Sequence, residues 1–335
     1  MPGSRTRPSA PDPDILREAK RSLYRLSGGS PTGGPAWEIG ERIDRKSSSV
    51  FPLRLRETGS KVDAYYKEAL VKVAETDELS ARILNAERAG LARRLEVEER
   101  FADSLVGEDI TFSRTLAVDP ARMISVTKAV PGRPFGRPLF HLVPPGRRRR
   151  AHKLIERTGR AARLIESAQG AWVDPDEHLD AARVERRLRV IEPVLDPVLY
   201  TRLTDTIEQL YADIKASDEP IALAHGDLSS SNLLVDGGLG LIDFSWIPRI
   251  RGYDVANFAF RLEFHDLMPV SLKATFRESL LTGYGDPLLE QSPHWRYLRL
   301  ASLIKKIHSG GGAKGKKRLL MERAFVEISH LTTPL

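Results

Sequence analysis

Polar residues that could take part in proton transfer and metal binding stand between apolar runs in residues 223–246, LAHGDLSSSNLLVDGGLGLIDFSW. Asp227 and Asn232 lie five positions apart, and Asp243 follows the next apolar run. Asp and Asn weaken strands, so the stability of the flanking strands does not require them. A carboxylate can accept the proton of a hydroxyl, and Mg²⁺ prefers hard oxygen ligands. The stretch therefore predicts chemistry on a hydroxyl close to a bound magnesium ion.

The spacing from Asp227 to Asn232 is that of a kinase catalytic loop, in which an Asp precedes an Asn by five positions. A polar turn would use the same residue types, but an apolar run on each side and the following LIDFS favour the loop. HGDLSSSN and LIDFS resemble the aminoglycoside phosphotransferase and choline kinase group of the protein-kinase-like superfamily, and the resemblance covers about residues 37–300. The resemblance implies that Asp227 is the catalytic base and that Asn232 and Asp243 are magnesium ligands. It also implies that His225 is a structural residue of the loop. Asp254 would start a helix and brace the loop.

A kinase also needs a lysine on its third strand to hold the α- and β-phosphates, and a glutamate on the next helix to orient that lysine. The predicted third strand contains Lys67, and the predicted helix contains Glu87. Glu87 lies four residues after Ile83 and four before Leu91, so we expect it on the inward face, where a carboxylate needs a cationic partner. Lys72 is the alternative lysine, on the opposite face of an ideal strand.

The loop expected to cover the phosphates lies between the first two predicted strands and reads DRKSSSV, without glycine. Serine hydroxyls and backbone N–H groups can still meet phosphates, although the backbone approaches less freely than with glycine. Ser47, Ser48 and Ser49 are the candidates for this contact.

The sequence favours a small-molecule acceptor over a protein. Gly226 stands where many protein kinases carry an arginine that reads a phosphorylated activation loop. Ten residues, FSWIPRIRGY, separate Asp243 from Asp254, with no A-P-E motif, which leaves little room for a peptide-binding segment. The helical stretch between Gly132 and His225 resembles the insertion that shapes the substrate site in this group. We therefore expect an ATP- and Mg²⁺-dependent phosphotransferase acting on a hydroxyl of a small molecule.

Two other functions remain open from the sequence. One is an atypical protein kinase or ATPase that acts on a protein or an RNA-associated complex, which HGDLSSSN and LIDFS also fit. The other is a nucleotide-binding protein that has lost catalysis. The intact Asp227, Asn232 and Asp243 argue against the second, and the long helical insertion argues against the first.

The charge of the acceptor is predicted from the C-terminal segment, which is expected to supply much of the substrate pocket. Residues 255–335 hold seven acidic and twelve basic side chains, and the whole chain has a net charge of +7. The electrostatic field of this positive charge favours neutral or anionic acceptors, whereas polycationic aminoglycosides need a carboxylate-rich pocket. Glu263 and Asp266 are the best candidates for a local acidic cluster. We expect a sugar, a sugar phosphate or a related polyol derivative.

The elements that must position these residues follow from periodicity and composition. Alternation predicts three strands, then a helix with Asp77 as its N-cap, then a strand pair closed at Pro131, and helical periodicity continues after it. The ranges are 36–43, 50–57 and 61–71 for the strands, 76–95 for the helix, 114–120 and 123–132 for the pair, and 147–215 for the helical stretch.

This order predicts an α+β, bilobal protein-kinase-like fold, with a strand-rich N-lobe containing one helix and a larger helical C-lobe. We expect a flexible N-terminal tail at residues 1–35 with one possible helix at 13–26. The N-lobe is expected at 36–130, and the C-lobe at 131–335 with the catalytic loop and the substrate site.

The composition excludes several classes of protein. The chain has 335 residues, enough for two lobes with their own cores, and no cysteine, which excludes disulfides, thiolate nucleophiles and cysteine-ligated metals. No apolar run approaches the ~18 residues of a membrane span, and the N-terminus has no apolar signal segment, so we expect a cytoplasmic protein without a membrane span. Aromatic residues are not interleaved with the basic runs, so nucleic-acid binding is not expected.

Overall fold

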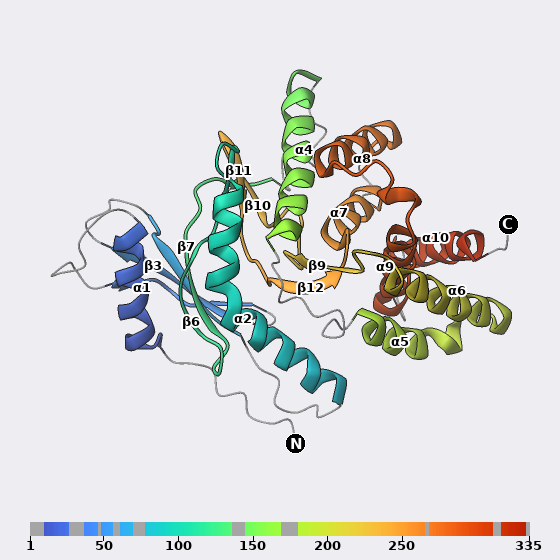
Figure 1. The fold of residues 1–335 in the computed structure, drawn as a ribbon, viewed down its shortest axis with the longest axis horizontal. Helices are drawn as coiled ribbons and strands as arrows, with labels where there is room; N and C mark the ends of the chain where they lie inside the picture. The colour runs from blue at the N-terminus through green and yellow to red at the C-terminus, as the bar shows by residue number, and fades with distance from the viewer. Residues whose placement is uncertain are drawn as a thin grey trace. The chain divides into compact units, whose positions relative to one another are not determined.

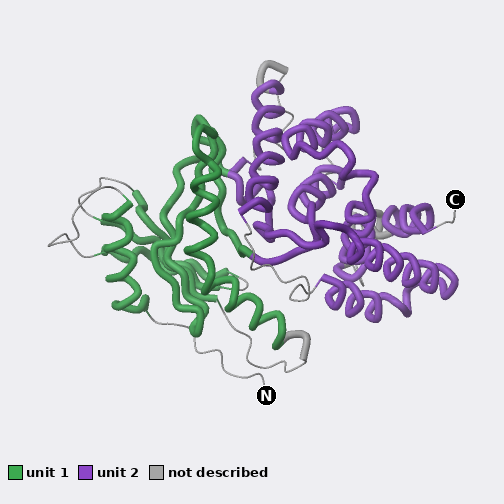
Figure 2. The backbone as a smooth tube through the Cα atoms, in the orientation of Figure 1, with its two compact units in different colours: residues 1–133, 234–246 green, residues 134–233, 247–335 purple. Residues whose placement is uncertain are grey.

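The structure is a computed structural model that describes residues 10–26, 37–45, 48–55, 61–69, 78–135, 145–168, 180–264, 268–310 and 316–332. The chain forms two compact units, coloured separately in Figure 2. Unit 1 comprises residues 1–133 and 234–246, and unit 2 comprises residues 134–233 and 247–335. The short segment 234–246 thus belongs to unit 1, whereas the sequence placed all of 131–335 in one helical lobe.

Unit 1 is built on an antiparallel sheet, six-stranded within the described residues, in which β4 is a central strand. The strand order is β1-β3-β4-β7-β6, and β2 pairs with β3. Lys67 on β4 lies opposite Val50 of β3 and Ser125 of β7. A strand overlaps each of the five predicted ranges: β1 (Trp37–Ile39), β3 (Ser48–Leu55), β4 (Ala64–Ala69), β6 (Thr115–Asp119) and β7 (Ile124–Lys128). The short β2 (Ile43–Asp44) was not predicted as a separate strand.

One face of this sheet is covered by α1 (Pro13–Leu26), the short helix that apolar spacing predicts, and Figure 1 shows it beside the sheet. Leu16, Ala19 and Leu23 are spaced three and four residues apart, and they share a buried cluster with Leu53 and Tyr66 of the sheet. Because this stripe is buried, α1 packs on the sheet of unit 1, at the bounds of the helix that the sequence allowed within the tail.

The helix α2 (Glu78–Ser104) follows β4 and changes character along its length. Its second half buries Val97, Glu98 and Phe101, whereas Glu87 in the first half is exposed. A second sheet has the order β5-β11-β10-β8, and its strands are β5 (Ile110–Phe112), β8 (Arg133–Pro134), β10 (Leu233–Asp236) and β11 (Gly238–Leu241).

Unit 2 is mostly helical, as the periodicity of 147–215 predicts. Two of its helices, α4 (Pro145–Ser167) and α8 (Val270–Tyr284), cross so closely that a Cβ added to Gly159 would lie 1.9 Å from the carbonyl oxygen of Leu280. The other elements are α5 (Asp180–Ile191), η4 (Glu192–Val194), α6 (Pro197–Lys215), β9 (Ile221–Ala224), β12 (Ile247–Ile250), α7 (Tyr253–Glu263), η5 (Leu289–Gln291), α9 (Pro293–Gly310) and α10 (Lys316–Leu331).

The ladder of β9 and β12 positions the polar stretch of unit 2. These strands pair antiparallel, from Ile221 opposite Ile250 to Ala224 opposite Ile247. All four residues of β9 are buried, and the segment 225–232 begins directly after it. Among the described residues, no helix is both long enough and apolar enough to cross a membrane.

Candidate active site

The segment 225–232 of unit 2 is held by the buried carboxylate of Asp254, at the start of α7. Asp254 accepts hydrogen bonds from the backbone N–H of His225 at 2.5 Å and of Gly226 at 3.1 Å. Gly226 has φ +89°, a conformation that glycine adopts without strain. The His225 ring is fully buried, and its Nδ1 lies 3.4 Å from the backbone nitrogen of Asp227. These contacts fix the backbone that leads into Asp227.

The Asp254 carboxylate is unusual because the protein buries it almost completely, at 3% exposure. Burial raises its pKa from the ordinary 3.8 to about 7, because desolvation disfavours the charged form. The two backbone N–H donors act in the opposite direction and lower the pKa, while the nearby Glu166 carboxylate raises it further. Asp254 therefore titrates close to neutral pH.

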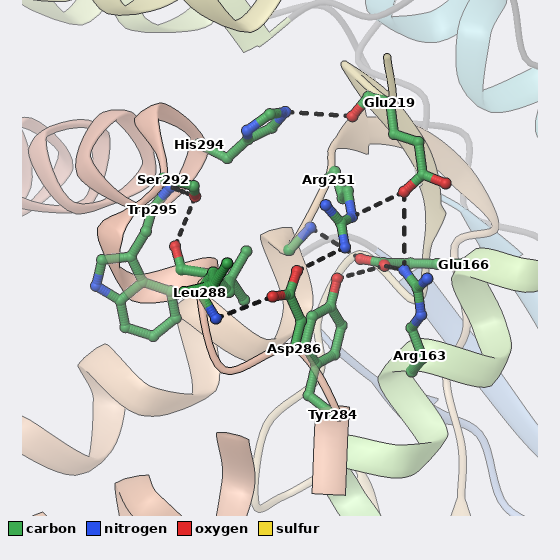
Figure 3. Close-up of polar contacts among 12 residues, drawn as sticks. Arg163, Glu166, Glu219, Arg251, Tyr284, Asp286, Leu288, Ser292, His294 and Trp295 are labelled. Carbon is green, nitrogen blue, oxygen red and sulfur yellow. Dashed lines mark hydrogen bonds and ion pairs between the residues drawn. The ribbon is translucent and has the colours of Figure 1, made fainter. Parts of the chain in front are cut away.

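Glu166 of α4 is a second buried carboxylate in unit 2, and Figure 3 shows its contacts. It accepts the N–H of Gly252 at 2.8 Å and the hydroxyl of Tyr284 at 2.5 Å, and thereby ties α4 and α8 to the start of α7. Burial raises the pKa of Glu166. Beside it, Arg251 binds the carboxylates of Glu219 at 3.1 Å and Asp286 at 2.7 Å. This polar network anchors the helix that carries Asp254.

Asp227 and Asn232 contact each other across the loop. The Nδ2 of Asn232 donates to the carbonyl oxygen of Asp227 at 2.9 Å and to its carboxylate Oδ2 at 3.1 Å. The other carboxylate oxygen of Asp227 accepts from Nη2 of Arg261 at 2.6 Å. Asn232 is buried, whereas the Asp227 side chain is about half exposed, at 52%. The loop thus presents an oriented carboxylate to solvent.

A pocket of about 360 Å³ lies within unit 2 and includes Asp227 in its wall. Elements far apart in the sequence contribute to it: α5, the loop 225–232, β12, α7 and α9. Its charged lining is mostly basic, with Arg183, Arg187, Arg249, Arg261 and Lys305 against Asp180 and Asp227. The sequence did not identify α5 as a source of these cations. The helical spacing in ARVERRLRV predicts a helix, but it does not show which part of the protein the arginines of that helix face.

Unit 1 brings together Lys67 and Asp243, the predicted nucleotide lysine and one of the predicted magnesium ligands. The Nζ of Lys67 on β4 lies 2.5 Å from Oδ1 of Asp243, which follows β11. Asp243 has φ +65°, a conformation uncommon for a residue other than glycine. The next side chain, Phe244, stacks on Trp246 with ring centroids 4.4 Å apart and also packs on Phe101 of α2. Aromatic packing therefore holds the backbone turn that directs Asp243.

A buried glutamate that the sequence did not single out supports this turn. Glu98 of α2 accepts the indole N–H of Trp246 at 3.2 Å, and both the N–H and the hydroxyl of Thr115, at 2.5 and 2.6 Å. Its charge is balanced by Arg94, whose Nε lies 2.9 Å away. The sequence signal that could have identified Glu98 was its spacing of four residues from Arg94, on a helix face that also carries Phe101.

The structure corrects the expectation for Glu87. Its side chain is exposed, so it does not lie on the inward face of α2. Ile83 and Leu91, which predicted that face, are themselves only partly buried, because the first half of α2 is covered less than the second. The pair described for Lys67 is with Asp243. The alternative Lys72 and the predicted N-cap Asp77 lie outside the described residues.

The serine candidates are also placed differently from the expected loop. Ser48 and Ser49 begin β3 and are buried, at 2% and 0% exposure, and the Ser49 hydroxyl donates to Asp44 at 2.9 Å. Both side chains are buried and the Ser49 hydroxyl already has a partner, which does not support hydroxyl contacts with phosphates. Ser47 lies outside the described residues.

The predicted magnesium ligands have suitable chemistry. Asn232 uses its Nδ2 in both of its side-chain hydrogen bonds, so within the described residues its amide oxygen has no hydrogen-bond donor. Asp243 offers a carboxylate at the end of a strand. Magnesium is commonly held by one or two such oxygens together with substrate phosphates and water. Each of these two groups is therefore of a type that suits the ion.

The chain and its fold match known phosphotransferases. The choline/ethanolamine kinase family protein from Mesorhizobium loti aligns with a TM-score of 0.53 and 16% identity, over 96% of this chain and 95% of that one. A putative fructosamine-3-kinase from Thermobifida fusca gives 0.52 and 15%, over 94% and 99%. The ternary complex of streptomycin, ATP and APH(2'')-IIa gives 0.50 and 12%, over 96% and 97%. No curated protein matches the sequence.

These likenesses show the fold, and they confirm the prediction of an α+β, protein-kinase-like architecture. The model of the phosphotransferase enzyme family (APH) matches residues 62–301, which is most of the chain. The resemblance on which the sequence interpretation rested is thereby confirmed, and the chain belongs to the phosphotransferase enzyme family.

Proposed function

We propose that the chain transfers the γ-phosphoryl group of ATP, with Mg²⁺, to a hydroxyl of a small neutral or anionic sugar or polyol derivative. The main observation that supports this proposal is that Asp227 lies in the wall of a pocket with an excess of basic residues. Two of the similar structures, a choline/ethanolamine kinase family protein and a putative fructosamine-3-kinase, also favour a small acceptor.

The reaction needs a base at the acceptor hydroxyl. In our proposal the hydroxyl oxygen forms a bond to the γ-phosphorus, the bond from that phosphorus to the β,γ-bridging oxygen breaks, and ADP leaves with the electron pair. Asp227 accepts the hydroxyl proton and later releases it to water. Asn232 and Arg261 hold the Asp227 carboxylate from two sides, so that its orientation is set before the acceptor arrives.

The remaining roles concern the nucleotide. We assign Lys67 to its α- and β-phosphates, and Asn232 and Asp243 to the metal. Bound Mg²⁺ would supply positive charge that stabilises the phosphate oxygens during transfer. His225 and Asp254 hold the loop backbone and contact no reacting group in this proposal. Catalysis would come mostly from positioning and from charge stabilisation.

The test is transfer from γ-labelled ATP by the purified chain, with and without Mg²⁺. Pools of sugars, sugar acids, sugar phosphates and polyols form one arm, and RNA and ribosomal fractions form the other. We expect labelled product in the small-molecule arm, dependent on Mg²⁺ and lost in Asp227→Asn. Label that enters only the macromolecular arm would contradict the proposal and favour the protein- or RNA-directed alternative.

A further inference from the structure

The cations in the pocket of unit 2 outnumber its carboxylates, and two of them are already paired. Arg249 binds Asp180 at 2.7 Å, with both side chains only 8% exposed. Arg261 binds Asp227 at 2.6 Å. The other three cations of the lining have no hydrogen-bond or ion-pair partner among the residues that the structure describes: Arg183, Arg187 and Lys305.

These three cations come from two helices that pack against each other. Arg183 and Arg187 are four residues apart on α5 and therefore lie on the same face of it. Lys305 stands on α9, which contacts α5. The pKa of Lys305 is lowered, first by desolvation and then by the charges of Arg187 and Arg261. Gathering like charges costs free energy, and a bound anion would offset that cost.

Tyr297 of α9 adds a neutral donor to the same pocket. Its side chain is fully buried, and its hydroxyl has no hydrogen-bond partner within the described part of the chain. Burial raises the pKa of this phenol above its usual range, so it stays protonated at neutral pH. A buried hydroxyl without a partner is destabilising unless a ligand or water bonds to it.

We propose that the pocket binds an acceptor that already carries a phosphate monoester, which Arg183, Arg187 and Lys305 hold while a free hydroxyl of the same molecule meets Asp227. The inference rests on the proposed function and specifies its substrate class. A phosphate monoester carries about −1.5 to −2 charges at neutral pH and three acceptor oxygens, which suits three cations. A carboxylate carries one charge, and a cationic amine would be repelled. Arginine forks pair well with phosphate oxygens.

The experiment compares acceptors that differ only in one group: ribose, ribonate and ribose 5-phosphate, and glucose, gluconate and glucose 6-phosphate. Kanamycin serves as the polycationic acceptor. Steady-state kcat and KM are measured for wild type, Arg187→Ala, Arg187→Lys and Lys305→Ala. The matched control is Arg189→Ala, because Arg189 stands on the same helix but pairs with Glu185 and does not line the pocket. Thermal melting checks that each variant folds.

We expect the phosphorylated members to have the highest kcat/KM. Arg187→Ala and Lys305→Ala should raise KM for these members by on the order of tenfold or more, because each removes a charge-assisted bond, and should leave kcat nearly unchanged. Arg187→Lys should recover part of the loss, and Arg189→Ala should match wild type. Calorimetry with ribose 5-phosphate and with inorganic phosphate, without ATP, should show binding that weakens in the same two variants.

The outcomes separate this inference from the proposed function. Asp227-dependent transfer to neutral, carboxylated or cationic acceptors, unaffected by Arg187→Ala, would overturn the inference and leave the proposed function standing. A fall in kcat for every acceptor would also overturn it, because the cations would then act on the transferred group. Arg187-dependent phosphate binding without transfer to any acceptor would support the anion site and count against the proposed function. Absence of phosphate binding would overturn the inference.

Discussion

Lys67 and Asp243 form an ion pair in unit 1, with 2.5 Å between Nζ and Oδ1, although they stand 176 positions apart in the chain. Both side chains remain partly exposed, at 39% and 36%. The pair therefore joins the central strand β4 to the turn after β11 and presents a cation and an anion together. In the proposed function these two groups contact the same nucleotide, one through its phosphates and one through the metal.

Replacing Lys67 should impair nucleotide binding. Lys67→Ala removes a charge-assisted contact to phosphate, so we expect KM for ATP to rise by about tenfold or more. Lys128→Ala is the matched control, because Lys128 is an exposed lysine on the neighbouring strand β7. Lys72→Ala should have far less effect than Lys67→Ala. A larger effect of Lys72→Ala would assign the nucleotide lysine to that position.

Replacing Asp243 should weaken the magnesium dependence of nucleotide binding. Wild type should bind ATP more tightly with Mg²⁺ than without it, and this difference should be much smaller in Asp243→Asn, because an uncharged amide is a weaker ligand than a carboxylate. Asn is chosen because it tolerates the positive φ of this position better than Ala. Calorimetry with and without Mg²⁺ measures the difference, with Asp236→Asn as an exposed control at the end of β10. A full magnesium response in Asp243→Asn would remove it from the metal site.

Replacing Asp227 should lower the rate of transfer without loss of nucleotide binding. If the carboxylate is the general base, Asp227→Asn should reduce kcat by ~10²–10⁴-fold. The variant can still accept a hydrogen bond from Arg261, so the loop should keep its fold. Single-turnover transfer and nucleotide affinity are measured side by side. Near-normal turnover in Asp227→Asn would show that another group takes the proton.

The buried Asp254 should make stability depend on pH. Its pKa is raised from 3.8 to about 7, so between these values the folded state binds more protons than the unfolded state. The contribution of Asp254 to stability should therefore be fully present below about pH 4 and should be lost as the pH rises through about 7. The shift corresponds to a few kcal/mol, at about 1.4 kcal/mol per pKa unit.

Asp254→Asn isolates this contribution because the neighbouring Glu166, whose pKa is also raised, is present in both proteins. Denaturant unfolding at several pH values should show a flatter profile between pH 4 and 7 for the variant than for wild type. Parallel profiles would mean that Asp254 is not protonated in this range.

The crossing of α4 and α8 should tolerate no added side-chain atom. A Cβ at Gly159 would overlap the carbonyl oxygen of Leu280, and one at Gly283 would lie 1.8 Å from the carbonyl oxygen of Glu156. Gly159→Ala should cost ~1–3 kcal/mol or more, although alanine favours helices. Arg150→Ala, on an exposed position of α4, should stay within ~0.5 kcal/mol of wild type. Equal unfolding midpoints for both variants would show that the crossing adjusts freely.

Local features of this protein were readable from its sequence because neighbouring residues decide them. Leu16, Ala19 and Leu23 repeat at helical spacing, and α1 has the predicted bounds. Alternation placed β4, and the spacing of Asp227 and Asn232 in one short loop set the contact between their side chains. The family resemblance depended on local patterns of this kind, HGDLSSSN and LIDFS.

Tertiary structure decided which helix faces are covered by other elements, and the sequence alone could not predict those faces. Glu87 and Glu98 stand on the same helix, yet packing against β6 and the aromatic cluster buries only Glu98. The charge excess of 255–335 predicted a neutral or anionic acceptor, but two of the five basic side chains of the pocket, Arg183 and Arg187, come from α5. Burial and pocket lining depend on contacts between segments far apart in the chain, and no local period encodes those contacts.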